Sequence, residues 1–357
     1  MTRARRTAVA AAIAAAALVL AGPPGRAQTL PYTLFERYVE ALRQQAGIPG
    51  LSAALVRNGT VDWERGFGRQ DVGRGIPAAP DTPYPVGGLT QSVTATLLGR
   101  CAESGTLDID RTVQALVPDF PDATATVREV LAHASDPATP GRFHYDATRF
   151  AALTAVAEAC SGRPLRTAVA TDILDRLGMA SSVPGLDLAT AGNAARLALP
   201  PAVVARYDDV LARVALPYRV DRSGKATRTE YPAPGYDAAS GLVSTVRDLA
   251  RLDAALDDGI LLRPDTLAVA WRPAVIGGEP LPTGLGWFVQ LYEGQRIVWQ
   301  FSQEPDGYSA LIVKVPARHV TLILLANSNG LASSATLETG DATTSPFVLV
   351  FLRLFAS

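Results

Sequence analysis

Lysine is nearly absent from this chain. Its 357 residues include two lysines, Lys225 and Lys314, and arginine supplies the rest of the positive charge. Neither lysine follows a serine at a spacing of three residues, the spacing that places two side chains one helical turn apart on the same face. A local serine–lysine pair, which would set an amine beside a hydroxyl, is therefore excluded.

Histidine and cysteine are also scarce. The histidines His133, His144 and His319 form no H-x-H or H-E-x-x-H pattern, which argues against a zinc hydrolase. We accordingly expect no metal and no cofactor. The cysteines Cys101 and Cys160 both fall late in predicted helices. They are interpreted either as a disulfide formed in an oxidising compartment or as two small core residues.

An excess of charge of one sign is missing as well. Lysine and arginine together number 33 against 34 aspartates and glutamates, so the formal net charge is −1. This balance gives no electrostatic basis for binding nucleic acid or an anionic membrane. The length is sufficient for one large domain or two ordinary ones, with a sizeable core.

Residues 1–27 are typical of a signal peptide. An apolar run over residues 8–21 is shorter than a usual membrane span, and small residues at Gly25 and Ala27 predict cleavage between Ala27 and Gln28. We therefore expect a periplasmic or secreted protein with no membrane span after cleavage, the alternative being an uncleaved anchor. The basic residues that precede the apolar run are Arg3, Arg5 and Arg6.

The stretch from Tyr84 to Gly105 is the centre of the sequence pattern. Gly87 and Gly88 precede an apolar run that is predicted to form a helix ending near Gly105. Backbone N–H groups at the start of a helix are unpaired, and the helix dipole favours negative charge there. This helix start is therefore the candidate site.

The same stretch resembles the first motif of the serine β-lactamase and DD-peptidase superfamily, particularly its class C β-lactamase branch. The family pattern F-x-I-G-S-x-T-K-x-x-T-A differs at its two reacting positions, where Gly88 replaces the serine and Gln91 replaces the lysine. Glycine has no oxygen for attack and glutamine has no titrating group. The positions that fit in register are Tyr84, Val86, Gly87, Thr90, Thr94 and Ala95.

The second and third motifs are altered at their reacting positions too. Tyr145 matches the tyrosine of the family's Y-x-N motif, whereas Ala147 replaces its asparagine. The family's K-T-G or H-x-G becomes Gln300-Phe301-Ser302, with no cation, imidazole or glycine. A tyrosine with a pKa near its ordinary value of about 10 is a weak base. The resemblance thus implies a cleft without an intact catalytic residue, bordered by Gly88, Gln91, Tyr145, Gln300, Phe301 and Ser302.

The resemblance extends from about Tyr32 to Phe355 and implies the fold. We expect an α/β (α+β) β-lactamase/transpeptidase-like domain over residues 28–357, with an antiparallel sheet flanked by helices. Its α/β lobe would comprise about residues 28–86 and 215–357, and a mostly helical lobe about residues 87–214. Within that lobe, His133 is interpreted as a hydrogen-bonded structural residue rather than a base.

Local patterns predict several elements directly. An amphipathic pattern predicts a helix over residues 32–46, and Asn58-Gly59 between two apolar runs predicts a β-hairpin. Further helices are expected over residues 151–159 and 347–355. Successive antiparallel strands are expected within residues 284–329.

Three functional hypotheses follow. The first is an exported, catalytically inactive β-lactamase-related protein with a ligand-binding or regulatory role. Gly88 would leave open space in its cleft, and a small carboxylate-bearing peptide or peptidoglycan fragment is the ligand suggested by analogy. The second is an active serine hydrolase of esterase, β-lactamase or peptidase type with a substituted mechanism, using Thr90, Ser92 or Ser302. No G-x-S-x-G motif supports it. The third is a structural partner of an active paralogue, which implies a protein partner.

Overall fold

The computed structural model describes residues 26–190, 192–231, 235–333 and 335–356. The basic start and apolar run of the predicted signal peptide lie outside the described residues. Among the residues that are described, no helix has both the length and the apolar character needed to cross a membrane.

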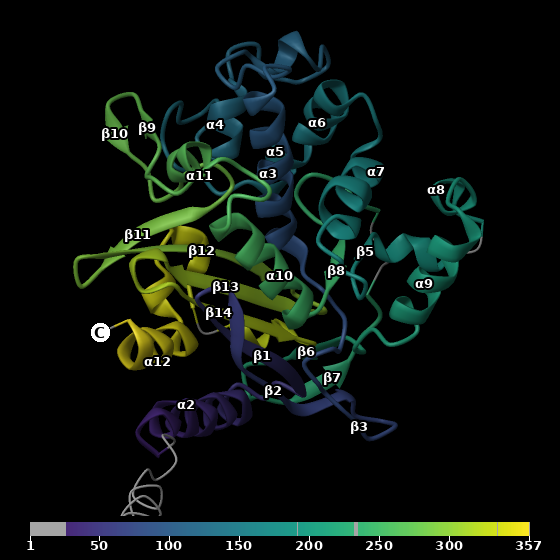
Figure 1. Cartoon of the computed structure of the whole chain (residues 1–357), viewed down its shortest axis with the longest axis vertical. Coiled ribbons are helices and arrows are strands. Elements are labelled where there is room, and N and C mark those ends of the chain that lie inside the picture. Colours follow the sequence, from purple (N-terminus) through teal and green to yellow (C-terminus); the bar gives the residue numbers. More distant parts are fainter. Residues whose placement is uncertain (1–25, 191, 232–234, 334, 357) are drawn as a thin grey trace, which may run out of the picture.

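A seven-stranded antiparallel sheet forms the centre of the molecule (Figure 1). Its strands follow the spatial order β11-β12-β13-β14-β1-β2-β3. Because β1 pairs with β14, segments from the two ends of the chain share one sheet. The strands are β1 Gly50–Arg57, β2 Thr60–Asp71, β3 Ile76–Pro77, β11 Phe288–Tyr292, β12 Gln295–Gln303, β13 Ser309–Val315 and β14 Val320–Ala326.

The predicted hairpin joins β1 to β2. Asn58 and Gly59 both have positive φ angles, of 49° and 73°, as a two-residue type I′ turn requires. Glycine adopts this conformation without steric cost, and asparagine is the side chain that tolerates it best. The local dipeptide therefore determined the position of this turn.

Both faces of the four central strands, β12, β13, β14 and β1, are largely buried, so these strands carry apolar residues on both sides. Leu51 and Leu55 of β1 pack on the side of helices α2 (Arg26–Gln45) and α12 (Pro346–Phe355). Ala54 and Val56 face the opposite side, where α10 (Val246–Asp257) contacts β1 and β14. The predicted N-terminal and C-terminal helices are thus confirmed, although α2 begins before residue 32.

A buried ion pair joins α10 to the sheet. The Lys314 ammonium donates hydrogen bonds to Asp253 Oδ1 at 2.9 Å, Asp257 Oδ2 at 2.7 Å and Thr321 Oγ1 at 3.2 Å. The side chain of Lys314 is 3% exposed. One of the two lysines therefore crosses the layer between β13 and α10.

The helix at the centre of the sequence pattern runs through the core. A single 3₁₀ turn, η1 (Gly87–Leu89), leads into α3 (Thr90–Glu103), and Thr90 to Leu98 are all buried. Its small hydroxyl residues bond to backbone groups, as Ser92 Oγ donates to Leu89 O at 2.8 Å. Gly105, with a φ of 75°, lies just beyond the end of the helix, as predicted.

The chain between β3 and β11 forms further helices, which lie beside the sheet and complete the mixed α/β architecture (Figure 1). The predicted helix over residues 151–159 forms as α6, after the short helix α5. These helices are α4 Val127–Leu131, α5 Ala147–Ala151, α6 Leu153–Ser161, α7 Leu165–Val169, α8 Ala194–Leu197, α9 Pro201–Leu211 and α11 Pro264–Ala270. A three-stranded sheet has the order β4 (Tyr84–Pro85), β8 (Leu242–Ser244) and β5 (Val183–Pro184). Two further sheets have two strands each. One pairs β6 (Tyr218–Val220) with β7 (Ala226–Arg228), and the other pairs β9 (Val275–Ile276) with β10 (Glu279–Pro280).

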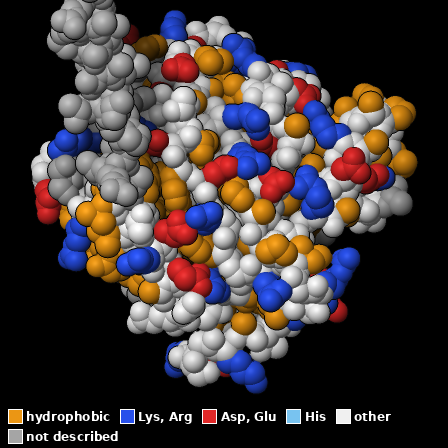
Figure 2. All heavy atoms as spheres, turned by 60° about the horizontal axis from the view of Figure 1, so that its bottom comes forward, with side chains coloured by type: hydrophobic (Ala, Val, Ile, Leu, Met, Phe, Trp, Pro, Cys, Tyr) orange, Lys and Arg blue, Asp and Glu red, His pale blue; other side chains and the backbone are white. Residues whose placement is uncertain are grey.

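The surface mixes the two signs of charge. Figure 2 shows Lys and Arg side chains interspersed with Asp and Glu side chains over one face of the molecule. This arrangement agrees with the near-zero net charge of the sequence.

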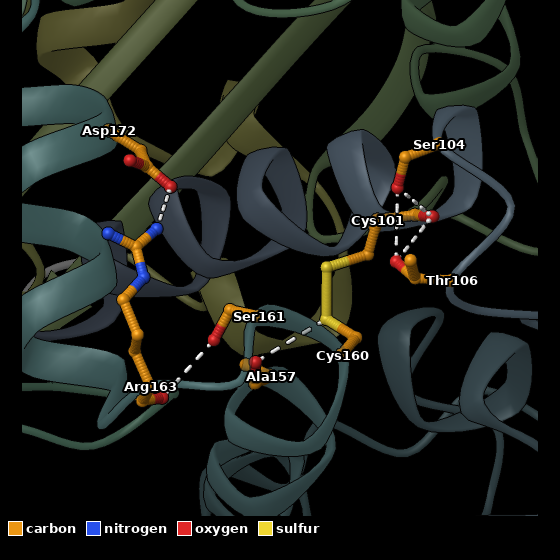
Figure 3. Close-up of a disulfide and its surroundings, with 8 residues drawn as sticks. All are labelled: Cys101, Ser104, Thr106, Ala157, Cys160, Ser161, Arg163 and Asp172. Atoms are coloured by element: carbon orange, nitrogen blue, oxygen red, sulfur yellow. Dashed lines mark hydrogen bonds and ion pairs between the residues drawn. A yellow bond between two sulfur atoms is a disulfide. The ribbon is translucent and has the colours of Figure 1, made fainter.

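A disulfide links Cys101 of α3 to Cys160 of α6 (Figure 3). The Cα atoms are 6.0 Å apart and the two residues are separated by 59 positions in the sequence. The sequence left open whether the two cysteines form a disulfide or are separate core residues. The packing of α6 against α3 brings the two helix ends together and decides for the disulfide.

We predict that the Cys101→Ser, Cys160→Ser double variant unfolds at lower urea concentration than the wild type. Opening a covalent loop of this length restores chain entropy to the unfolded state, and the expected loss is about 2–4 kcal/mol. Urea denaturation followed by circular dichroism measures it. Dithiothreitol should destabilise the wild type by a similar amount and leave the double variant unchanged. Equal stability of the two proteins without reductant would contradict the prediction.

Candidate functional site

Strand β12 approaches the start of the central helix at Gly88. A Cβ atom at Gly88 would lie 2.4 Å from the carbonyl oxygen of Phe301 and 3.4 Å from Tyr145 Oη. The first distance is shorter than real Cβ contacts allow, and the atom it would meet is backbone. The predicted neighbourhood of Gly88, Tyr145 and the third-motif strand therefore forms. The expectation that Gly88 leaves open space is wrong, because the strand backbone occupies that space.

A cleft of about 360 Å³ opens beside this contact. Six of the predicted positions line it: Gly88, Gln91, Tyr145, Ala147, Phe301 and Ser302. Ala147 is the first residue of α5, whose N-cap is Asp146. Gln300 does not line the cleft, since its side chain is 1% exposed and its amide is directed at Gln91 and Gly286. Residues that the sequence reasoning missed are Ala239, Ser240, Gln303, Glu304 and Glu338.

Gln91 is the centre of a buried network of neutral groups. Its Nε2 donates to Tyr145 Oη at 3.1 Å, and its Oε1 lies 3.0 Å from His133 Nε2. Gln300 Nε2 donates to the same Oε1 at 3.4 Å and to Gly286 O at 3.2 Å. Gln300 Oε1 accepts from the Phe301 N–H at 2.9 Å. The two glutamines thus satisfy each other and tie the helix to the strand without any formal charge.

His133 completes this network as a neutral imidazole. The Asp146 N–H donates to His133 Nδ1 at 3.2 Å, which assigns the ring proton to Nε2 and makes Nε2 the donor to Gln91. Burial lowers the pKa of His133 from 6.5 to about 3. The prediction of a hydrogen-bonded structural histidine agrees with these contacts.

Tyr145 is positioned as a proton donor rather than a base. Burial raises the pKa of its phenol to about 12, and this effect outweighs the hydrogen bond from Gln91. Its ring packs against Phe301, with centroids 5.3 Å apart. Since its oxygen accepts from Gln91, the phenolic proton remains for a further acceptor in the cleft.

The hydroxyl groups around the helix start differ in their contacts. Thr90 Oγ1 accepts from the Leu242 N–H at 3.2 Å, and Ser92 Oγ bonds within the helix. Ser302 Oγ is fully buried and has no hydrogen-bond partner among the described residues. A Cβ on Gly87 would meet Ser302 Oγ at 2.1 Å and Glu304 Oε1 at 2.9 Å, so both oxygens lie over Gly87.

Glu304 is the most informative residue that the sequence did not reveal. It follows the end of β12 and lines the cleft half-buried. Burial raises the pKa of its carboxyl group. The sequence offers one indication of its role, because Glu304 follows the third motif, Gln300-Phe301-Ser302, by two residues. Within the described residues, no group of three or more His, Cys, Asp or Glu side chains is arranged to hold a metal ion.

The sheet, the central helix and this cleft define a β-lactamase-type protein. The family model described as Beta-lactamase matches residues 35–342, and the chain belongs to this family. The serine beta-lactamase-like protein LACTB, mitochondrial, of Mus musculus is 30% identical over 112 residues, which cover 29% of this chain and 19% of that protein. The match thus spans about a fifth of that relative's length.

Solved structures share the fold. The octameric penicillin-binding protein homologue from Pyrococcus abyssi superposes with a TM-score of 0.71 at 22% identity, covering 90% of this chain and 77% of the other. The class C beta lactamase from Rhodobacter sphaeroides gives a TM-score of 0.64 at 18% identity, covering 83% and 94%. The resemblance inferred from the motifs and the predicted fold class are thereby confirmed.

We predict that Gly88→Ala destabilises the protein by about 1–3 kcal/mol, because the added Cβ forces β12 and η1 apart. Urea denaturation measures the loss. Gly73→Ala is the matched control, since the nearest atom to its Cβ, Asp71 Oδ1, is 3.6 Å away. Its effect should stay below about 0.5 kcal/mol. Identical unfolding of the two variants would contradict the close approach at Gly88.

We predict that His133 makes the protein less stable as the pH falls from about 6.5 toward 3. In this range the unfolded chain binds a proton at His133 and the native state does not, so stability declines by about 1.4 kcal/mol per pH unit. Urea denaturation at several pH values measures the free energy of unfolding. In His133→Asn this free energy should fall less steeply with decreasing pH, the slope being smaller by about 1.4 kcal/mol per pH unit.

His319→Asn is the matched control for this experiment. His319 is exposed and, like His133, has a positive φ angle that asparagine tolerates. Its variant should keep the pH dependence of the wild type. An unchanged slope in His133→Asn would show that His133 is not held neutral.

Proposed function

We propose that this protein is a non-catalytic, ligand-binding member of the Beta-lactamase family. The observation that carries the proposal is the filled space at Gly88. The position of the family's nucleophile has no side chain, and a Cβ there would meet the Phe301 carbonyl oxygen at 2.4 Å. Any hydroxyl at this position would first require the strand to move.

The absence of a base at the lysine position supports the same conclusion. Gln91 cannot accept a proton from a nucleophile, and its amide is already engaged with Tyr145, His133 and Gln300. With a pKa of about 12, Tyr145 is protonated at neutral pH. Removing the nucleophile or base from a cooperating catalytic unit costs on the order of 10⁶ in turnover in serine proteases.

The remaining hydroxyl groups offer no obvious replacement for the nucleophile. Thr90 and Ser92 are engaged with backbone groups, and Ser302 Oγ has no hydrogen bond to a base among the described residues. What persists is the cleft itself, with Tyr145 and Phe301 as aromatic walls. Such a partly apolar cleft with a few polar groups is typical of small-molecule sites.

We also infer that the protein is exported to the periplasm or secreted. The basic and apolar pattern of residues 1–27 supports this, and so does the Cys101–Cys160 disulfide, because disulfides persist mainly in oxidising compartments. Cleavage after Ala27 would leave nearly all of α2 in the mature chain.

The test is the intact mass of the mature protein after incubation with a penicillin and, separately, with a fluorophosphonate. We expect an unmodified mass with both reagents, while an active serine hydrolase treated in parallel gains the adduct. The Ser302→Ala variant is measured beside the wild type. A stoichiometric adduct on the wild type would overturn the proposal, and its loss in Ser302→Ala would identify the nucleophile.

A further inference from the structure

We propose that the cleft binds the protonated amine of a small organic ligand, with Glu304 as its counter-ion. The inference rests on the proposed ligand-binding function and names the chemical class of ligand. It also departs from the carboxylate-bearing ligand that the family resemblance suggests.

The first argument is the charge of the cleft. The residues that line it in the described part of the chain include two carboxylates, Glu304 and Glu338, and neither a lysine nor an arginine. A ligand carboxylate would therefore meet like charge and no cation to receive it. A ligand cation would meet opposite charge on both glutamates.

The second argument is the state of Glu304. Its carboxylate is half-buried and has neither a hydrogen-bond partner nor an ion-pair partner among the described residues, in contrast to the paired Glu36, Glu40 and Glu64. Partial burial disfavours its charged form and raises its pKa. A cation bound at the carboxylate would reverse that cost, because an opposite charge favours the ionised form.

The third argument is the unpartnered hydroxyl beside it. Ser302 is 3% exposed, and its Oγ lacks a hydrogen-bond partner within the described part of the chain. Buried hydroxyl groups are normally hydrogen-bonded. Both Ser302 Oγ and Glu304 Oε1 lie over Gly87, as the close contacts of a Cβ at that glycine require. An ammonium group has three donors and no acceptor, which suits one carboxylate and one hydroxyl oxygen at the same point.

The walls of the cleft suit an apolar group attached to the amine. The rings of Tyr145 and Phe301 lie 5.3 Å apart at an interplanar angle of 37°. Aromatic faces attract cations and pack against apolar groups. The ligand class is therefore an amine that carries an aromatic or aliphatic side group.

Three probes of similar size and different charge test the proposal. Phenethylammonium, phenethyl alcohol and hydrocinnamate are titrated into the mature wild-type protein, and binding is followed by isothermal calorimetry and by ligand-observed NMR. We expect phenethylammonium to bind best, the alcohol more weakly and hydrocinnamate most weakly. The proposal is overturned if hydrocinnamate or the alcohol binds as tightly as the ammonium, or if no probe binds at millimolar concentration.

The residue assignment is tested with Glu304→Gln, which keeps the size of the side chain and removes its charge. We expect its affinity for phenethylammonium to fall about tenfold or more, since a hydrogen bond to a charged group is worth at least this factor. Glu279→Gln, at an exposed position of β10, is the control and should bind like the wild type. Unchanged binding by a folded Glu304→Gln variant would refute the assignment.

The result of these binding experiments is independent of the result of the mass experiment that tests the proposed function. None of the three probes carries an ester, an amide or another acyl group with a leaving group, so their affinities do not depend on catalysis. An adduct with a fluorophosphonate would overturn the non-catalytic proposal and leave the charge preference intact. Failure of the ammonium to bind would overturn only the ligand class.

Discussion

The carbonyl oxygen of Phe301 lies against the backbone of Gly88, and the rest of the site depends on this approach. Strand β12 can come this close to the helix start only because no Cβ stands between them. The Gln91–Gln300 contact and the Phe301 N–H bond to Gln300 then hold strand and helix together with neutral groups. In this arrangement the replacement of the family's serine by Gly88 permits the close packing of β12 as well as removing an oxygen.

The neutral glutamine at position 91, where the family has a lysine, forms hydrogen bonds with its buried neighbours. A lysine at position 91 would need compensation for its burial, whereas glutamine satisfies His133, Tyr145 and Gln300 through one amide. Burial keeps the imidazole of His133 neutral and the phenol of Tyr145 protonated. The carboxylate of Glu304, which lines the cleft without a hydrogen-bond or ion-pair partner among the described residues, is the group on which the proposed recognition of a cation rests.

The family fold and its scaffold were predictable from the sequence because they depend on local and periodic signals. Asn58-Gly59 determined a hairpin through its φ angles, and the glycines around the central helix determined its ends. The altered reacting positions could also be read directly, since each stands at a known spacing from matched neighbours. Gln300 was predicted to border the cleft, but its amide is buried in hydrogen bonds to Gln91 and Gly286, contacts that only the tertiary packing creates.

The sequence by itself determined the residue types at positions 88, 91 and 147, and with them the replacement of the family's serine, lysine and asparagine. Tertiary structure alone decided how far β12 advances on Gly88, that Cys101 meets Cys160, and that Glu304 enters the cleft without a partner. These features depend on distances between segments as far apart in the sequence as Gly88 and Phe301. Such distances follow from the packing of helices and strands, and no local pattern in the chain encodes them.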